Sequence, residues 1–156
     1  MKGRLIAVVG AAKCDSATAS VAGEVGRLLA EAGAVVVCGG LGGVMEAACQ
    51  GASEAGGLTV GLLPGKDPAD ANRFVSVPIA TGLGEARNSV IAHACAGMIA
   101  VGGEYGTLSE IALALKLGKP VVGLGTWSLS RGGRVDGGIV AAATPVEAMH
   151  ALLRLL

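Results

Sequence analysis

Arg87 and Glu110 are the side chains of this sequence best suited to acting on a ligand. A guanidinium forms strong charge-assisted hydrogen bonds with phosphate, and a carboxylate stabilises positive charge that develops on a sugar during bond cleavage. Arg87 falls in the first turn of a predicted helix, where the helix dipole disfavours a cation that has no anion beside it. Glu110 has an alternative structural role, because Thr107-x-x-Glu110 has the spacing of a capping box, in which Glu110 accepts only the backbone N–H of Thr107.

Three glycine-rich turns accompany these two residues, and each follows a predicted strand. Glycine lets a backbone approach a ligand closely, and the free N–H groups at the start of a helix attract anions. The turns therefore predict a site for a phosphorylated small molecule, and the alternative is that they are tight connections without a ligand. The predicted contacts are Gly10, Gly39, Gly40, Gly42, Gly43, Met45, Asn88, Gly102, Gly103, Tyr105, Gly106 and Thr107.

Two common nucleotide-binding motifs are missing from these turns. The first turn reads Gly10-Ala11-Ala12-Lys13, and the second, Gly40 to Met45, lacks the last glycine of GxGxxG. The sequence therefore disfavours a nicotinamide-dependent dehydrogenase. It also contains no GxxxxGK[ST], which excludes a P-loop NTPase.

The elements that must position these residues alternate regularly between strand and helix. Alternation of this kind predicts a doubly wound, Rossmann-like α/β fold with a mostly parallel sheet and a single domain over residues 1–156. In such a sheet, ligands bind outside the carboxyl ends of the strands, where the glycine turns lie. Strands are predicted over residues 5–9, 34–38, 58–63, 74–77, 98–101, 121–124 and 139–142, and helices over 17–32, 44–55, 84–96, 108–117 and 145–155.

Several boundaries rest on single residues. Ser16 is the predicted N-cap of the first helix, and Gly33 is predicted to follow its end. Pro78 is expected to stop the fourth strand, and the glycine-rich segment 125–138 is expected to be a loop. Thr144-Pro145-Val146-Glu147 has the capping-box spacing, with proline at the first helical position.

The composition limits the partners that this protein can have. The chain has 156 residues with 12 basic and 12 acidic side chains, and only three aromatic residues, so neither a basic stripe nor a base-stacking surface for nucleic acid is expected. No apolar stretch is long enough for a membrane span, which makes the cytoplasm the expected location. The four cysteines lack metal-ligand spacing, so no metal site is predicted. Low charge and apolar helices predict a homo-oligomer, either a dimer or a tetramer.

Three segments together resemble the Lonely Guy (LOG) superfamily, a group once labelled "possible lysine decarboxylase". They are residues 39–47 (GGLGGVMEA), 85–88 (EARN) and 102–110 (GGEYGTLSE). The superfamily's enzymes carry the motif Pro-Gly-Gly-x-Gly-Thr-x-Glu-Glu. Within it, this short chain is most similar to the branch that includes the molybdenum cofactor carrier proteins.

The resemblance implies two functions. LOG enzymes are nucleoside 5′-monophosphate phosphoribohydrolases, which release a free base and ribose 5-phosphate, and their catalytic Arg and Glu match Arg87 and Glu110. Here, however, Glu104 and Ser109 replace a glycine and a glutamate of the enzymes' motif. We therefore expect a carrier that binds a nucleotide or the molybdenum cofactor and requires no further cofactor. Hydrolysis is the alternative, and lysine decarboxylation is not expected.

Overall fold

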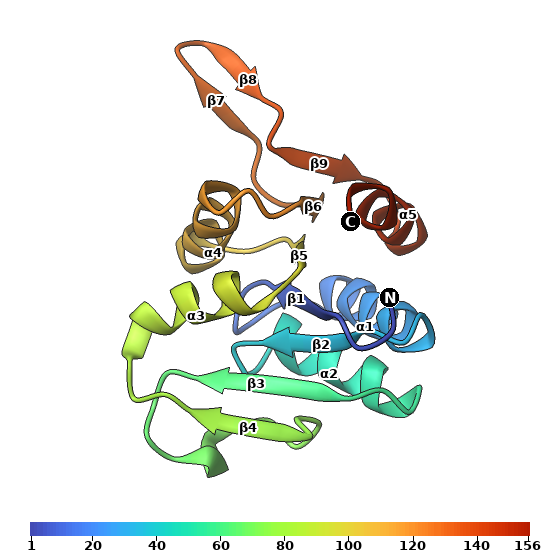
Figure 1. Cartoon of the computed structure of the whole chain (residues 1–156), viewed down its shortest axis with the longest axis vertical. Helices are drawn as coiled ribbons and strands as arrows, with labels where there is room; N and C mark the ends of the chain where they lie inside the picture. Colours follow the sequence, from blue (N-terminus) through green and yellow to red (C-terminus); the bar gives the residue numbers. More distant parts are fainter.

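One seven-stranded parallel sheet forms the centre of the computed structural model, which describes residues 1–156 (Figure 1). Its strand order is β4-β3-β2-β1-β5-β6-β9, and every pairing is parallel. The strands are β1 (Leu5–Val9), β2 (Val35–Cys38), β3 (Thr59–Leu63), β4 (Val77–Ala80), β5 (Gly97–Val101), β6 (Val121–Leu124) and β9 (Ile139–Ala142). The predicted Rossmann-like α/β fold is confirmed.

Five α-helices cover the two faces of this sheet. They are α1 (Ser16–Glu31), α2 (Val44–Glu54), α3 (Arg87–Ala94), α4 (Tyr105–Lys116) and α5 (Pro145–Leu155). Figure 1 shows α3 and α4 on one side and α1, α2 and α5 on the other. Two buried apolar clusters follow this division: one joins α1, α2 and α5 to the sheet, and the other joins α3 and α4 to it. Successive residues of β1 alternate between the clusters, because neighbouring side chains of a strand point to opposite faces.

The order of the strands creates a crevice beside β1. The chain moves outward from β1 to β4 and then returns to place β5 against the free side of β1. The connections that leave β1 and β5 therefore diverge to opposite faces of the sheet. Ligands of open α/β sheets bind at such a point of reversal.

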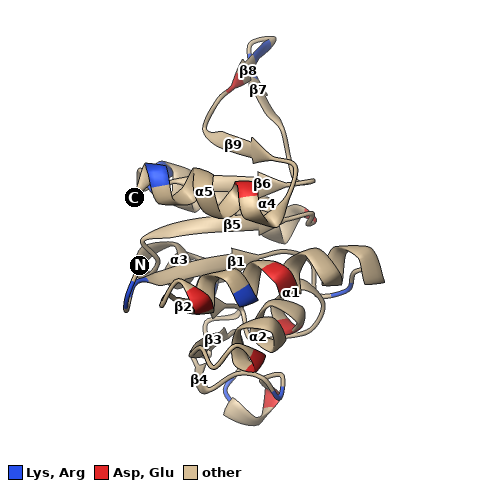
Figure 2. Ribbon diagram, turned by 90° about the vertical axis from the view of Figure 1, so that its right-hand side faces the viewer, with Lys and Arg blue, Asp and Glu red and all other residues tan.

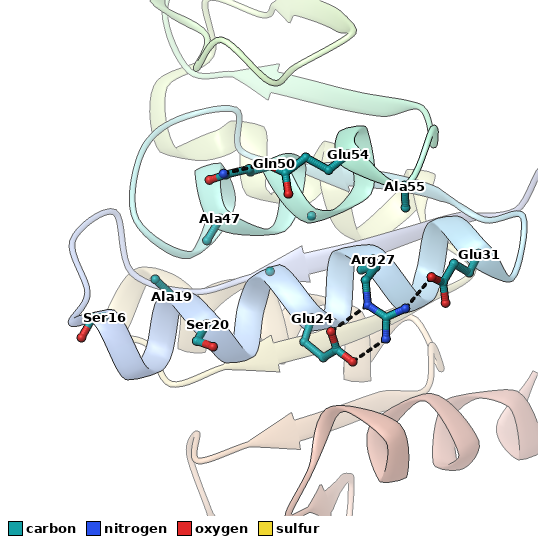
Figure 3. A pocket seen from close by; sticks show the side chains of 12 residues that line it. Ser16, Ala19, Ser20, Glu24, Arg27, Glu31, Ala47, Gln50, Glu54 and Ala55 are labelled. Carbon is teal, nitrogen blue, oxygen red and sulfur yellow. Dashed lines mark hydrogen bonds and ion pairs between the residues drawn. The ribbon is translucent and has the colours of Figure 1, made fainter.

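Close approach of α1 to α2 depends on glycine. A Cβ on Gly51 would overlap the carbonyl of Gly23, and a Cβ on Gly26 would overlap the carbonyl of Ala48. Figure 3 shows α1 and α2 side by side. Because glycine has no side chain, α1 and α2 can pack almost backbone to backbone at these positions.

Two predictions about the strands were wrong. The fourth strand begins at Val77 and contains Pro78, because β4 pairs only with β3 and its outer edge needs no amide from proline. The segment 125–138 was predicted to be a loop but contains an antiparallel hairpin of β7 (Leu129–Arg131) and β8 (Arg134–Asp136). Its turn residues Gly132 and Gly133 have φ values of 57° and 77°, which suit a two-residue hairpin turn.

The starts of three helices, α1, α3 and α4, differ from the predictions. Asp15, rather than Ser16, caps α1, and its Oδ1 accepts the N–H of Thr18 at 2.7 Å. The predicted helix 84–96 begins as a 3₁₀ turn, η2 (Gly84–Ala86), and becomes α-helical at Arg87. Outside the predicted helices, a further 3₁₀ turn, η1 (Pro68–Asp70), lies in the segment before β4.

Helix α4 starts at Tyr105 instead of residue 108, so Thr107 lies inside the helix and is not its cap. The alternative prediction, that Glu110 forms a capping box with Thr107, is therefore wrong. Two other helix-boundary predictions are confirmed: Gly33 follows α1 with a φ of 77°, and Thr144 caps α5 through the N–H of Glu147.

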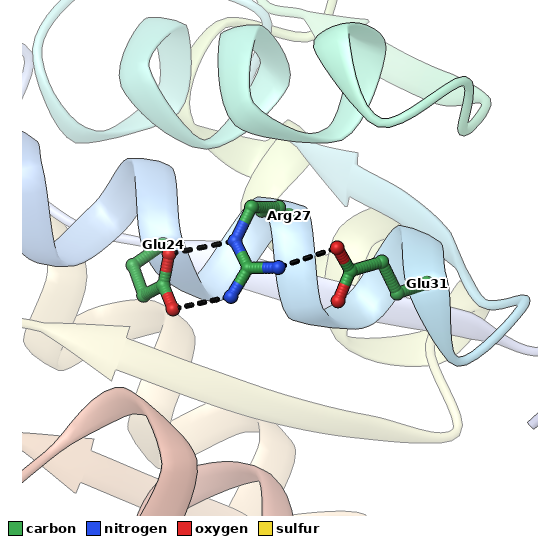
Figure 4. A network of polar contacts seen from close by, with 3 residues as sticks. All are labelled: Glu24, Arg27 and Glu31. Atoms are coloured by element: carbon green, nitrogen blue, oxygen red, sulfur yellow. Dashed lines mark hydrogen bonds and ion pairs between the residues drawn. The ribbon is translucent and has the colours of Figure 1, made fainter.

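Charged residues are sparse along the ribbon in the view of Figure 2. The most extensive group of ion pairs lies on α1, where Arg27 makes two hydrogen bonds to Glu24, at 2.6 and 2.8 Å, and a third to Glu31 (Figure 4). Exposed pairs of this kind add little to stability. No helix combines the length and apolar character that crossing a bilayer requires.

We predict that Gly51→Ala lowers the free energy of unfolding by about 2 kcal/mol or more, because the new methyl group overlaps the backbone of α1. Gly106→Ala is the matched control, since no atom lies within 4 Å of a Cβ at that helical position. It should leave stability unchanged or raise it slightly. Chemical denaturation of both variants measures the difference, and equal effects would contradict the proposed helix contact.

Candidate functional site

A pocket of about 760 Å³ opens at the carboxyl edge of the sheet, beside the point where the strand order reverses. The turn after β1 forms one wall, the first turns of α3 and α4 form another, and α2 contributes the side chain of Met45. The lining residues are Gly10, Ala11, Ala12, Lys13, Leu41, Met45, Pro64, Gly84, Glu85, Arg87, Asn88, Glu104, Tyr105, Gly106, Thr107, Ser109 and Glu110.

Arg87 is held in place by the backbone of two neighbouring strands. Its Nη1 donates to the carbonyl of Gly39, just after β2, at 2.7 Å and to the carbonyl of Leu62 in β3 at 2.6 Å. The residue is 9% exposed, and its buried Nε has no hydrogen-bond partner. A buried donor without a partner costs free energy. The guanidinium is thus fixed at one end and has unused hydrogen-bonding capacity beside the pocket.

Glu110 faces the same pocket from the second turn of α4. The residue is 7% exposed, and no side chain forms a hydrogen bond or an ion pair with its carboxyl group. Burial raises its pKa to about 7, although the positive charge of Arg87 partly opposes this shift. Near neutral pH, Glu110 is therefore divided between a neutral acid that can donate a hydrogen bond and a carboxylate that cannot.

The first turn of α4 offers backbone donors. No side chain caps this helix, and no acceptor within the chain receives the N–H groups of Tyr105, Gly106 and Thr107. Free amides at a helix start favour an anion. The ring of Tyr105 is 77% exposed and lies 5.4 Å from that of Trp127, measured between centroids.

The structure brings eight of the predicted site residues together in the pocket. They come from separate segments of the chain and are Gly10, Met45, Arg87, Asn88, Tyr105, Gly106, Thr107 and Glu110.

The other six predicted residues are not among those that line the pocket, and several of them contribute to packing. Gly43 has a φ of 61° and sits against the carbonyls of Ala11 and Ala12, and Gly40 packs on β3. Gly103 lies against the side chain of Thr107, and the carbonyl of Gly102 accepts a hydrogen bond from Thr126. Direct ligand contact by Gly39, Gly40, Gly42, Gly43, Gly102 and Gly103 stays a prediction.

Sequence reasoning missed the charged residues at the rim of the pocket. Lys13, Glu85 and Glu104 line it together with Arg87 and Glu110. Lys13 could have been found from its position, because it lies four residues after the end of β1 in a turn at the binding edge. Glu85 belongs to one of the three segments that resemble the LOG superfamily, but its side chain had no predicted role.

A second hollow, of about 740 Å³, runs between α1 and α2 on the face of the sheet that α1, α2 and α5 cover (Figure 3). Most of its charged residues have a partner within the groove: Arg27 contacts Glu24 and Glu31, and Glu54 accepts a hydrogen bond from Gln50 at 2.8 Å. It contains no buried polar group without a partner. This groove is therefore the weaker candidate.

Comparison with known proteins identifies the family of the chain. Residues 3–149 match the model of the SLOG cluster4 family. The chain belongs to this family. An uncharacterized protein from Archaeoglobus fulgidus is 47% identical over 150 residues, which cover 96% of this chain and 95% of the relative. The predicted relationship to the LOG-like superfamily is confirmed.

Two solved structures carry more specific information. The molybdenum cofactor binding protein of the phototrophic bacterium Rippkaea orientalis is 34% identical, with a TM-score of 0.89 over 99% of this chain and 98% of that one. A molybdenum cofactor carrier protein of Chlamydomonas reinhardtii is 37% identical, with a TM-score of 0.83 and the same coverage. The DNA-processing protein DprA of Streptococcus pneumoniae, at 20% identity and a TM-score of 0.71 over 95% of this chain and 61% of that one, shares the fold alone.

We predict that Glu110→Gln stabilises the protein, and that the gain depends on pH. The pKa of Glu110 is raised from 4.5 to about 7, so folding favours the neutral acid. The penalty on the wild type therefore grows between about pH 4.5 and pH 7 and stays constant above that, whereas glutamine is neutral throughout. The gain should be small at pH 4 and roughly 3 kcal/mol above pH 8.

Thermal unfolding across this pH range tests the prediction. Glu85→Gln removes another carboxylate from the same pocket, but from an exposed position, so it should give no comparable gain at high pH. A stability difference for Glu110→Gln that does not change between pH 4 and pH 8 would rule out the burial of charge as its cause.

Proposed function

We propose that this protein binds the molybdenum cofactor, or a close analogue with a ring system and a phosphate group, and acts as its carrier. The full-length similarity to proteins named for binding and carrying this cofactor supports the proposal. The observation that carries it is Arg87, a buried cation with an unpaired Nε beside a pocket of suitable size. Pockets of a few hundred cubic ångströms are typical of small-molecule sites.

The pocket provides a different kind of contact for each part of such a ligand. The free N–H groups at the start of α4 and the guanidinium of Arg87 suit a phosphate. Met45 and Leu41 offer apolar surface, and the exposed ring of Tyr105 offers a face on which a planar ring system can stack.

The charge of the pocket depends on Glu110. Lys13 and Arg87 supply two positive charges, while three carboxyl groups, those of Glu85, Glu104 and Glu110, line the same walls. An anionic ligand raises the pKa of Glu110 further, because it disfavours a second negative charge nearby. We infer that Glu110 is neutral in the complex and donates a hydrogen bond to the ligand.

Phosphoribohydrolysis is the second candidate function. It is favoured by one observation: Arg87 and Glu110, the counterparts of the catalytic pair in LOG enzymes, line the same pocket. A hydrolase needs an ionised carboxylate near the sugar, whereas burial pushes Glu110 toward its neutral form. Ser109 supplies no replacement for the missing carboxylate of the enzymes' motif. The carrier function is therefore the better supported of the two.

We predict that AMP raises the melting temperature more than adenosine does, because only AMP carries a phosphate for Arg87 and the start of α4. Arg87→Ala should weaken AMP binding by roughly 1.5–3 kcal/mol, the value of a hydrogen bond to a charged group. Calorimetric titration measures this loss. Arg27→Ala is the control, because it removes an arginine of α1 that lies outside the pocket.

Equal effects of AMP and adenosine on the wild type would contradict phosphate recognition. The same samples separate the two functions. A carrier leaves AMP intact, whereas steady release of adenine by the wild type that disappears in Glu110→Gln would establish hydrolysis. Because Glu110→Gln also changes stability, its melting temperature must be compared with that of the wild type first.

We further propose that the protein is a dimer or tetramer. The two edge strands support this, because Val77 and Ile79 of β4 are 45% and 43% exposed and Val140 of β9 is 36% exposed. Association would cover apolar side chains that now contact water. Sedimentation at micromolar concentration should give a species larger than the 15.1 kDa chain, and a monomer would refute this proposal.

A further inference from the structure

Two buried thiols lie next to each other directly behind the pocket. Cys38 ends β2 and Cys49 belongs to α2, and their Sγ atoms are 3.4 Å apart. Both residues are fully buried. A disulfide requires the sulfur atoms to approach to about 2.05 Å, so the two side chains must move closer together before they can bond. Neither thiol has a part in the ligand contacts described above.

The surroundings of this pair favour its chemistry. The backbone N–H of Gly40 donates to Sγ of Cys38 at 3.3 Å. The pKa of Cys49 is lowered, mainly because Cys38 can donate its S–H to the Cys49 thiolate. The thiolate is the nucleophilic form of cysteine, so Cys49 is the better placed of the two to react first.

The cover over the pair is thin and lies beside the pocket. Cys38, Cys49 and Met45 form a small cluster, which the half-buried side chains of Leu41 and Phe74 partly cover. Met45 and Leu41 also line the pocket. One layer of side chains therefore separates the thiols from solvent, and small fluctuations of this layer would admit a molecule the size of a peroxide.

The pair is also linked to Arg87 through a single residue. Gly39 follows Cys38, and its carbonyl accepts the 2.7 Å hydrogen bond from Nη1 of Arg87. There is no free space at this link, since a Cβ on Gly39 would overlap Nη1 of Arg87 and lie 2.7 Å from Sδ of Met45. A shift of Cys38 would thus be passed to the guanidinium.

We propose that Cys38 and Cys49 are an oxidation site for hydroperoxides, at which a reversible disulfide alters the pocket through Gly39 and Arg87. The Cys49 thiolate attacks one peroxide oxygen, the O–O bond breaks, and the departing oxygen takes up a proton, leaving a sulfenic acid on Cys49. Sγ of Cys38 then attacks that sulfur, loses its proton, and the S–O bond breaks to release water. Two thiols are oxidised, and one peroxide is reduced to water, or to an alcohol and water.

The experiment uses the double variant Cys14→Ser/Cys95→Ser, in which Cys38 and Cys49 are the only cysteines left. The folded protein is treated with hydrogen peroxide, then denatured and alkylated. We expect the loss of both alkylatable thiols, the loss of two hydrogen atoms in intact mass, and recovery of both thiols after reduction. Persistence of both thiols, or oxidation of Cys49 to a sulfinic acid without a disulfide, would overturn the proposal.

Two single variants test whether Cys38 and Cys49 are the reacting pair. Cys49→Ala in the wild-type background retains Cys14, Cys38 and Cys95, and it should form no intramolecular disulfide. Its melting temperature shows whether it is folded, and Cys38→Ala is the second variant if it is not. A disulfide in either variant would show that another pair of cysteines reacts.

The effect on the pocket is read separately, and this part rests on the proposed function. Oxidation of the double variant should abolish the rise in melting temperature that AMP gives in the reduced protein, and reduction should restore it. An AMP response that is unchanged by a fully formed disulfide would refute the coupling. If AMP has no effect on the reduced protein, the proposed function fails, while the thiol measurement still decides whether the oxidation site exists.

Discussion

The attachment of one buried guanidinium to the ends of two strands organises the candidate site. Arg87 is far in sequence from Gly39 and Leu62, yet its Nη1 donates to both carbonyls at 2.7 and 2.6 Å. Burial of an arginine is costly unless hydrogen bonds compensate it. The two carbonyls provide part of this compensation, and they also fix the start of α3 against β2 and β3. The unpaired Nε leaves part of the cost to be offset by something else, for which an anion in the pocket is the natural partner.

This attachment explains why the turn after β2 is so rich in glycine. At Gly39 a side chain would occupy the position of the guanidinium, and at Gly43 it would meet the backbone of the turn after β1. The N–H of Val44 donates to the carbonyl of Ala11 at 3.1 Å, which joins the two turns directly. Glycine in this segment thus serves the packing of backbone against backbone. Met45 and Arg87, in contrast, line the pocket.

The sequence predicted the fold and about half of the candidate site, and the difference has a physical cause. Alternating apolar strands and amphipathic helices are local patterns, so the parallel sheet could be predicted without knowing any tertiary contact. Pro78 led to a wrong strand boundary, because its effect depends on whether a strand is at an edge, which is a property of the whole sheet. The start of α4 was missed because Gly106 looked like part of a turn, although in the structure nothing contacts the position of its absent Cβ. The hairpin of β7 and β8 differs from these cases, because the pair Gly132-Gly133 is itself a local sequence signal for a two-residue hairpin turn.

The contacts that give the site its chemical character could not be predicted in this way. The hydrogen bonds of Arg87, the burial of Glu110 and the proximity of Cys38 to Cys49 all join segments that the chain order separates. The burial of Glu110 bears on the choice between the two candidate functions. A carboxyl group that burial keeps partly neutral near pH 7 can hold an anion by donating a hydrogen bond, but it stabilises a developing cation poorly. The burial of Glu110 therefore supports the proposed carrier function over hydrolysis.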